Sequence, residues 1–370
     1  MKTRRTVIVA AAILVAGLAA LSGLPRVMVA ESLPARLADQ EYWKLIADFS
    51  EPNGTFRSDN LLSNERWLQY VIPDLTRTAK AGRVYMGVGP EQNFTYITAL
   101  KPKMAFIVDV RRGNLHLHLM YKALFELAVD RADFMAKLFS KKRPSGLSPK
   151  STVTDIVTAY SNLDETRETL YKENLKAMFD LLATKHGFAL SEEDRQGIEY
   201  VYHAFFWNGP SINYNSSTGA GGGFGAGSYQ PTYADLLVAT DMGGQMRGFL
   251  ATEENFAFMK DLETKNLLVP VVGNFAGPRA IRAIGKYLKE KGATGSAFYL
   301  SNVEQYLMRE NGWHDFCGNV ATLPLDETST FIRATRGGGF GGGGGLSSEL
   351  GGMLEQVKPC AAAAQRQLPH

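Results

Sequence analysis

Two glycines and one aspartate have the types and the spacing of a ligand site at the end of a sheet. Gly87 and Gly89 follow a short apolar run in the stretch RVYMGVGPEQNFTYI, and a segment that can begin a helix comes next. Glycine there lets a ligand approach the backbone, and a helix N-terminus attracts a negative group. Asp109 lies 20 residues after Gly89, at the end of a second apolar run, where a carboxylate accepts hydrogen bonds from both hydroxyls of a ribose. We therefore expect a nucleotide-type site; the alternative is a tight turn in which Asp109 caps the next helix.

The glycine pattern does not fit every nucleotide equally well. The dinucleotide fingerprint requires a third glycine where this chain has Gln92, so a nicotinamide oxidoreductase ranks lower. A loop with two glycines and an acid for the ribose is what class I S-adenosylmethionine-dependent methyltransferases use. This chain departs from their loop at Tyr85, where an acid is frequent, and at Glu91, where a third glycine would fall.

The elements that must position these residues alternate between strands and helices. Apolar runs predict strands at residues 83–88, 104–110, 235–240, 267–273, 294–301 and 329–335. Segments with helical spacing lie between them, at residues 91–100, 116–139, 252–265 and 277–292. This alternation predicts an α/β fold of the Rossmann-like type, with a mostly parallel, doubly wound sheet and helices on both faces.

Further segments flank or interrupt the predicted α/β domain, residues 81–336. Residues 31–80 are predicted to form an N-terminal helical cap. Residues 151–206 are predicted to be a helical insertion, with a C-cap at Gly187 and a capping-box sequence from Ser191. The glycine-rich run at 219–228 predicts a flexible loop, and the run that begins at Gly337 predicts a disordered tail over residues 337–370.

Residues 1–30 have the pattern of a secretory signal peptide or an uncleaved membrane anchor. Basic residues precede an uncharged run from Thr6 to Leu24, and Ala30 offers a cleavage point. The adjacent arginines also fit a twin-arginine export signal, a route that carries folded proteins. We expect an exported protein, periplasmic or extracellular, whose contact with a membrane is limited to this segment.

Charge and cysteine content argue against several classes of function. The 370 residues carry a formal net charge of +3 without a clustered basic face, so we predict no nucleic-acid binding. Cys317 and Cys360 cannot form a zinc site by themselves; one disulfide is arithmetically possible, although Cys360 falls in the predicted tail. His116 and His118 are weak metal candidates, and His203, which lies among aromatic residues, is predicted to be a buried structural histidine.

Three long stretches resemble an uncharacterised bacterial family whose fold is similar to that of class I S-adenosylmethionine-dependent methyltransferases. They are SEPNGTFRSDNLLSNE, the run from GVGPEQNFTYI to AVDRADF, and the run from LLVPVVGNFAGPRAI to SNVEQYL, and the resemblance covers residues 40–335. It implies that Gly87 and Gly89 lie near the methionine part of the cofactor S-adenosylmethionine. It also implies that Asp109 binds the ribose and that Asp241 stands near the adenine.

Other candidate residues follow later strands or precede the sheet. The resemblance places Asn274 and Phe275 where methyltransferases hold catalytic or substrate-positioning groups. Glu304 follows a strand and could act as a base or bind substrate; the alternative is that Ser301 or Asn302 simply caps a helix. Residues 57–60 either fold over the top of the sheet as a lid or hydrogen-bond their own turns.

Two functions follow from these patterns. The leading hypothesis is methyl transfer from S-adenosylmethionine to an unknown small molecule, with Asn274 and Glu304 as catalytic candidates and positioning as the main contribution. The export signal favours the alternative, an exported, non-catalytic ligand- or partner-binding module on a degenerate methyltransferase fold, because S-adenosylmethionine is made in the cytoplasm. An open cleft bounded by Gly87, Asp109 and Asp241 would support the enzyme. A side chain such as Tyr85 or Phe94 filling that cleft would support the module.

Overall fold

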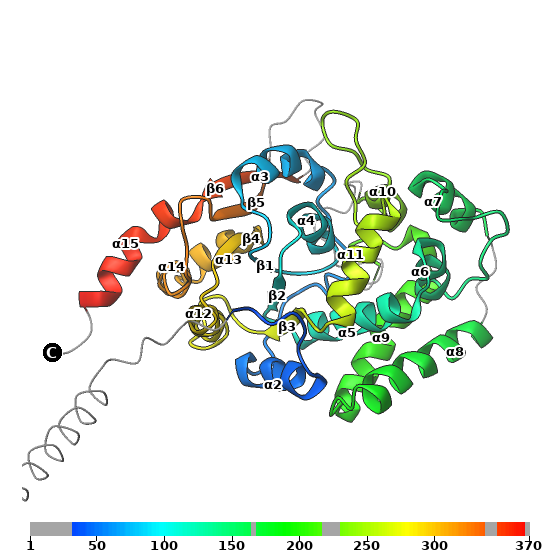
Figure 1. The fold of residues 1–370 in the computed structure, drawn as a ribbon, viewed down its shortest axis with the longest axis horizontal. Helices are drawn as coiled ribbons and strands as arrows, with labels where there is room; N and C mark the ends of the chain where they lie inside the picture. Colours follow the sequence, from blue (N-terminus) through cyan, green and yellow to red (C-terminus); the bar gives the residue numbers. More distant parts are fainter. Residues whose placement is uncertain (1–31, 164–167, 217–229, 337–345, 367–370) are drawn as a thin grey trace, which may run out of the picture. The chain divides into compact units, whose positions relative to one another are not determined.

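A six-stranded sheet lies at the centre of the computed structural model, which describes residues 32–163, 168–216, 230–336 and 346–366 (Figure 1). The strands are β1 (Val84–Gly87), β2 (Met104–Asp109), β3 (Leu268–Val272), β4 (Gly295–Ser301), β5 (Thr330–Arg336) and β6 (Leu346–Gly352). Strands β1 to β5 are parallel, and β6 is antiparallel to β5. The predictions of strands at 83–88, 104–110, 267–273, 294–301 and 329–335 are confirmed.

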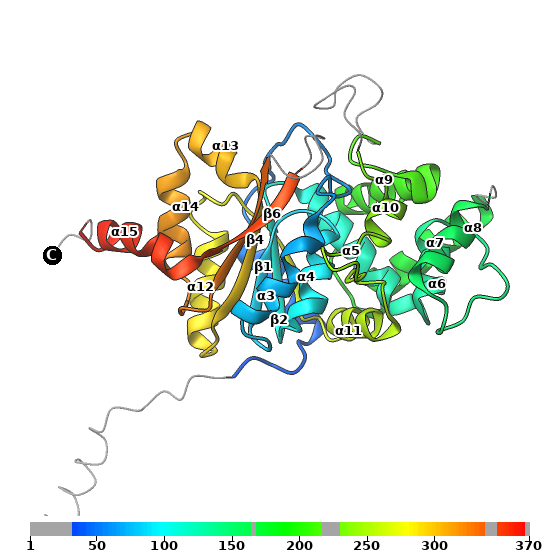
Figure 2. The same cartoon turned by 90° about the horizontal axis from the view of Figure 1, so that it is seen from above.

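The strand order is β3-β2-β1-β4-β5-β6, so the chain reverses its direction across the sheet between β1 and β4. Figure 2 shows α4 (Gln92–Leu100) and α5 (Arg112–Leu127) on one face and α12 (Ala280–Glu290) on the other. In open α/β sheets, ligands bind at such a reversal, beyond the carboxyl ends of the strands. The predicted α/β fold with a mostly parallel sheet is confirmed, and it is compatible with a Rossmann-like fold.

Helices cover both faces of the sheet. Besides α4 and α5, α11 (Glu253–Thr264) covers one face, and α13 (Val303–Arg309) and α14 (Trp313–Val320) join α12 on the other (Figure 2). Every residue of β1, β2 and β3 is buried. This double cover explains why the strands have continuous apolar runs instead of alternating ones.

The helical insertion between α5 and α11 is longer than the predicted 151–206. It comprises α6 (Arg131–Leu138), α7 (Val153–Ser161), α8 (Glu168–Phe179), the π-helical turn η2 (Asp180–Lys185), α9 (Glu192–Asn208), the 3₁₀ turn η3 (Gly209–Ser211) and α10 (Tyr233–Leu237). The single helix predicted at 116–139 is wrong, because Asp130 caps a separate α6 by accepting from the Asp133 amide. The strand predicted at 235–240 is also wrong, because Thr232 and Asp235 form a capping box that begins α10. The capping box predicted at Ser191 is confirmed.

The N-terminal part of the described chain contains α2 (Asp39–Phe49), the 3₁₀ turn η1 (Leu68–Val71) and α3 (Ile72–Thr78), as the predicted helical cap requires. The described residues from Ser32 onward form one compact unit. The predicted signal or anchor at 1–30 and the glycine-rich loop at 219–228 lie outside the described residues. Within the described ranges, none of the helices has the length and apolar content needed to cross a membrane.

The prediction of a disordered tail is wrong for residues 346–366. Strand β6 pairs with β5, with Phe331 opposite Gly351, and α15 (Met353–Arg366) follows. The glycines of β6 pair through the backbone, which requires no side chain. Cys360 of α15 forms a disulfide with Cys317 of α14, with 5.8 Å between the Cα atoms.

Candidate functional site

Residues 51–65, which we call the edge strap, lie along the carboxyl ends of the parallel strands. The strap begins at β3, where the Glu51 amide donates to the Val272 carbonyl at 2.7 Å. It passes the end of β2, where the Gly54 amide donates to the Val110 carbonyl at 2.8 Å. The strap therefore follows the edge on which an open α/β sheet binds its ligands.

The second half of the strap continues past β1 to β4. The Ser63 amide donates to the Glu91 carboxyl, just after β1, at 3.3 Å. At the end of β4, the hydroxyls of Tyr299 and Ser301 both donate to Glu65 Oε1, that of Ser301 at 2.7 Å. Residues 57–60 are the middle of the strap, and they also bond within their own turn, where the Asn60 amide donates to Ser58 Oγ at 3.2 Å.

The loop after β1 is a closed turn. The Asn93 side chain lies against Gly87 so closely that a Cβ there would come within 1.9 Å of Asn93 Oδ1. Asn93 Nδ2 donates to the three successive carbonyls of residues 88–90, at 2.7 to 3.2 Å. His118 Nε2 lies 2.9 Å from the Gly89 carbonyl, and the Tyr85 hydroxyl donates to Asn93 Oδ1 at 2.9 Å. Because Asn93 binds the carbonyls of this loop and its side chain fills the space beside Gly87, the two glycines serve the turn.

Asp109 is bound by an arginine of the chain itself. Arg111 donates through Nε and Nη2 to the two carboxylate oxygens of Asp109, both at 3.1 Å, and its amide donates to Oδ1 at 2.9 Å. Arg111 Nη1 also donates to strap carbonyls, that of Ser58 at 3.1 Å and that of Asp59. The N-cap of α5 is Arg111, so Asp109 does not cap this helix as the alternative proposed. Asp109 holds Arg111, and Arg111 holds the strap, where the sequence predicted a ribose.

Asp241 was predicted to follow a strand, but it lies in a loop after α10. Its carboxylate accepts from Arg247 Nε and from the amides of Gly243 and Gln245, at 2.8 and 2.9 Å. The bond from Arg247 is the main reason why the pKa of Asp241 is below its ordinary value. The described partners of Asp241 belong to its own loop, so Asp241 closes that loop and is not shared with Asp109.

The strap also supplies a carboxylate to the loop after β3. Glu51 accepts from the amides of residues 274, 279 and 280, at 2.8 to 3.1 Å, and a Cβ on Gly277 would lie 2.3 Å from its Oε2. An anion from the chain therefore lies at the N-terminus of α12. The Asn274 side chain is turned to its own loop, where it accepts from the Ala276 amide at 2.9 Å, and Phe275 is buried.

Glu304, the other predicted catalytic residue, is engaged in an ion pair. Arg333 of β5 donates to it through Nη2, at 2.9 Å, and through Nε. Asn302 stands at the N-cap of α13, as the alternative expected, but without a side-chain hydrogen bond, and Ser301 donates to Glu65 instead. Glu304 therefore joins α13 to β5.

Of the three histidines singled out in the sequence, two are buried and one is exposed. His203 is exposed on α9, so its prediction as a buried residue is wrong. His116 and His118 are buried, and His116 Nε2 lies 2.9 Å from Asp194 Oδ1. Burial lowers the pKa of His118 to about 4, so that its imidazole is neutral beside Gly89.

Two buried carboxyls, one at the end of the strap and one in the loop after β1, were missed as a pair by sequence reasoning. Glu65 is 1% exposed and Glu91 is 4% exposed. Burial raises the pKa of both groups, that of Glu91 to about 8 with a contribution from nearby Glu65. They lie at the reversal between β1 and β4. The sequence did contain a signal for Glu91, since this acid comes directly after the glycine turn at the end of a strand. The sequence analysis considered Glu91 only as the residue that replaces the third glycine of the methyltransferase loop.

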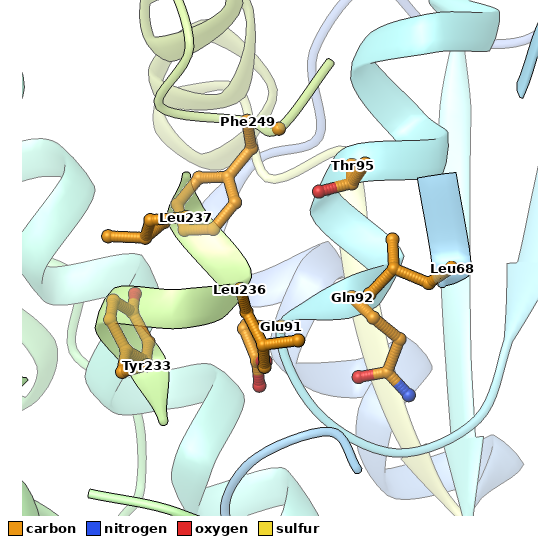
Figure 3. Close-up of a pocket in the computed structure, with 9 residues that line it drawn as sticks. Leu68, Glu91, Gln92, Thr95, Tyr233, Leu236, Leu237 and Phe249 are labelled. Carbon is orange, nitrogen blue, oxygen red and sulfur yellow. The ribbon is translucent and has the colours of Figure 1, made fainter. Parts of the chain in front are cut away.

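A small cavity lies beside Glu91. Figure 3 shows it between Gln92 and Thr95 of α4 on one side and Tyr233 of α10 on the other. Its volume of about 10 Å³ is close to the room that one water molecule needs.

A wider groove of about 330 Å³ lies between the start of α12 and α14, and Arg282 and Asp315 are among its lining residues.

Neither the small cavity nor the wider groove is lined by Gly87, Asp109 or Asp241, the residues that bound the cleft of the enzyme hypothesis. Tyr85 and Phe94 are both fully buried, and the ring of Phe94 packs edge-on against Tyr121 at 5.1 Å between centroids. The residues around Gly87 and Asp109 therefore do not fit S-adenosylmethionine. They are satisfied by Asn93, Arg111 and the strap.

Comparison with protein families shows where the chain belongs. No curated protein matches the chain. Residues 61–344, which contain β1 to β5 and the helices between them, match the family model described as Domain of unknown function (DUF7790). Because this match spans well over half of the sequence, the chain belongs to that family.

Proposed function

We propose that this protein is an exported, non-catalytic ligand-binding module on a methyltransferase-like fold. The observation that carries the proposal is the contact of Arg111 with both Asp109 and the strap. A cofactor that used Asp109 would have to displace a buried guanidinium that already donates to the Asp109 carboxylate and to two strap carbonyls. On this proposal, Arg111 and the strap stand where a methyltransferase would bind S-adenosylmethionine.

The strand order supports the methyltransferase-like assignment. The sequence β3-β2-β1-β4-β5 followed by an antiparallel last strand is similar to the sheet of class I methyltransferases. The reversal between β1 and β4 lies where those enzymes bind cofactor. We infer descent of the fold from a cofactor-binding form whose edge is now closed.

The disulfide supports export. Cys317 and Cys360 are joined, and disulfides persist mainly in oxidising compartments such as the periplasm and the cell exterior. The N-terminal signal pattern leads to the same location. S-adenosylmethionine is not expected in these compartments, and a binding module does not require it.

The groove between α12 and α14 is where we place the ligand. Its volume of about 330 Å³ is in the range of small-molecule sites, about 300–1,000 Å³. Asn319 accepts from Arg282 Nε at 2.6 Å and donates to the carbonyls of Phe275 and Gly277, so it fixes the guanidinium. An arginine and an aspartate in one groove suit a small zwitterion, with its carboxylate on Arg282 and its ammonium on Asp315.

Calorimetric titration tests both parts of the proposal. We expect no saturable binding of S-adenosylmethionine or S-adenosylhomocysteine at Asp109, and saturable binding of at least one member of the series glycine, β-alanine and γ-aminobutyrate. Butyrate and butylamine, with one charge each, should bind at least about tenfold more weakly. Arg282→Gln and Asp315→Asn should each abolish zwitterion binding.

Absence of binding for all three zwitterions would overturn the groove assignment. Micromolar S-adenosylmethionine binding that is lost in Asp109→Ala would restore the methyltransferase hypothesis.

A further inference from the structure

Four exposed basic residues lie at the amino ends of four neighbouring strands, one at each strand. Arg36 lies beside the start of β3, because the amide of the residue after it donates to the Lys265 carbonyl at 3.0 Å. Lys103 and Lys80 lie in the segments that lead into β2 and β1. Lys289 is in the last turn of α12, which leads into β4. We call these four residues the basic edge.

The sheet brings the basic edge to one side of the molecule. The strand order puts β3, β2, β1 and β4 next to one another, and these parallel strands all begin at the same edge of the sheet. Neighbouring strands lie about 4.8 Å apart, so the basic edge extends over a width of roughly 15 Å. Its members are far apart in the sequence, so no basic run indicated this face.

The charges of the basic edge are not balanced by the chain. None of its four side chains forms an ion pair with a residue of the described ranges. The acids that lie nearby are paired with other bases: Asp326 with Arg83, Glu254 with Lys101, Asp261 with Lys265 and Glu290 with Lys286. Glu327, an exposed acid before β5, lies beyond the row of four strands. The basic edge therefore keeps an excess of positive charge.

The N-terminal segment leads to the same edge. The described chain begins at Ser32, four residues before Arg36, at the lower end of the sheet in Figure 2. The apolar run of the predicted signal or anchor ends at Leu24, and the seven residues between it and Ser32 span at most about 25 Å. An anchor that is retained therefore brings the start of β3 close to the membrane surface.

We propose that the basic edge lies on the surface of a membrane that contains anionic lipids, with residues 1–30 retained as the anchor. Lipid phosphates give such a surface a negative potential, and each lysine or arginine near it strengthens binding about fivefold. Contacts of this strength suffice for a tethered domain, because the tether keeps its effective concentration at the surface high. The sequence limited membrane contact to residues 1–30, and this docking extends it to the folded domain.

Docking through the basic edge leaves the opposite edge of the sheet open to solvent. The strap and the start of α12, where the wider groove lies, both follow the carboxyl ends of strands. A ligand can therefore reach the groove while the basic edge is on the membrane. The inference agrees with the proposed ligand-binding function but does not depend on it.

Co-sedimentation with lipid vesicles measures the contact of the folded domain without the anchor. The chain from Ser32 onward forms one compact unit and serves for this test. We expect binding to vesicles of equimolar phosphatidylcholine and phosphatidylglycerol, and none to pure phosphatidylcholine. Raising the salt from about 0.1 M to about 1 M shortens the Debye length from about 10 Å to about 3 Å and should release the protein. Equal binding to both vesicles, or binding to neither, would overturn the proposal.

A DNA duplex of arbitrary sequence, at the same salt concentration, tests whether any polyanion serves. We expect it to bind more weakly than the anionic vesicles. A duplex that binds as tightly as the vesicles would show a general affinity for polyanions and would overturn the assignment to a membrane.

A matched pair of double variants locates the contact. Lys80→Gln/Lys103→Gln should weaken binding to the anionic vesicles by at least about tenfold, since each lysine contributes about fivefold. Arg57→Gln/Arg309→Gln removes the same charge beside Tyr306, at the opposite edge of the sheet, and should leave binding nearly unchanged. Equal losses in the two variants would show that only net charge matters and would contradict the basic edge.

Hydrogen–deuterium exchange of the full chain, reconstituted in the same two kinds of vesicle, reports the orientation without a variant. Peptides covering residues 79–83 and 101–103 should exchange more slowly in the anionic vesicles than in the neutral ones, and the strap should not change. Protection of the strap instead would place the opposite edge on the membrane and overturn the proposal. An intact mass of the exported protein that lacks residues 1–30 would contradict the retained anchor.

Discussion

Arg111 binds Asp109 through two nitrogen–oxygen contacts of 3.1 Å and, with its remaining nitrogen, holds the carbonyls of the edge strap. One guanidinium thus occupies the carboxylate that a ribose would use and fastens the segment that covers it.

Arg111→Ala should destabilise the protein by about 3–5 kcal/mol, because it leaves the Asp109 carboxylate buried without its partner. Denaturant unfolding measures this loss. Arg77→Ala is the control, because its ion pair with Asp74 is exposed and should contribute less than about 1 kcal/mol. Equal losses in the two variants would contradict the role given to Arg111.

Gly87→Ala should destabilise the protein by about 1–3 kcal/mol, since the new Cβ would meet Asn93 Oδ1 at 1.9 Å. Asn93 cannot move away without releasing the carbonyls of residues 88–90. Gly318→Ala, inside α14 with no atom within 4 Å of its new Cβ, should instead be neutral or stabilising by up to about 1 kcal/mol. Chemical denaturation compares the two. If Gly87→Ala left the free energy of unfolding unchanged, the turn would be packed less tightly than described.

The sequence predicted the sheet well because its strands are covered on both faces. Continuous apolar runs such as MAFIVDV are typical of strands that are buried on both sides. The run DLLVAT misled because a short apolar run does not distinguish a strand from a buried helix. The capping box formed by Thr232 and Asp235 was the signal that could have identified this run as a helix. Strand β6 was missed because its stabilising contacts are made by the backbone.

The sequence predicted where Asp109 lies in the fold but not which residues it contacts. The spacing from Gly89 placed Asp109 correctly at the end of β2. Its partner was only two residues away, and the pair Asp109–Arg111 could have been suspected from the sequence. The strap could not, because its contacts join residues far apart in the chain, such as Glu65 and Tyr299, 234 positions apart. No local pattern encodes such a contact.

Glu263 should make the stability fall as the pH rises. Burial raises the pKa of its carboxyl from the ordinary 4.5 to about 8, and neither of its oxygens has a hydrogen-bond partner among the described residues. Between these pH values the folded protein binds more protons than the unfolded chain. The contribution of Glu263 is therefore complete below about pH 4.5 and is lost as the pH rises through about 8, at up to about 1.4 kcal/mol per pH unit.

Glu263→Gln should flatten this dependence, because the amide cannot ionise. The free energy of unfolding measured from about pH 5 to pH 9 should fall less steeply than in the wild type. Glu290→Gln, at an exposed position of α12, should leave the slope unchanged. A Glu263→Gln variant with the slope of the wild type would show that another group controls it.

Removing the disulfide should cost about 2–4 kcal/mol, because it closes a loop between cysteines 43 positions apart. A reductant should lower Tm of the wild type and leave Tm of the double variant Cys317→Ser/Cys360→Ser unchanged. Two titratable thiols in the unfolded, unreduced protein would contradict the bridge and weaken the argument for export.

The most direct test of the closed edge is hydrogen–deuterium exchange of the peptide covering residues 51–65, with and without S-adenosylmethionine. The structure predicts slow exchange at the amides of Glu51, Gly54 and Ser63, which donate to Val272, Val110 and Glu91, and no change on adding the compound. Rapid exchange of the strap, together with new protection of the loop after β1 when S-adenosylmethionine is present, would show that the strap opens to admit a cofactor and would contradict the account.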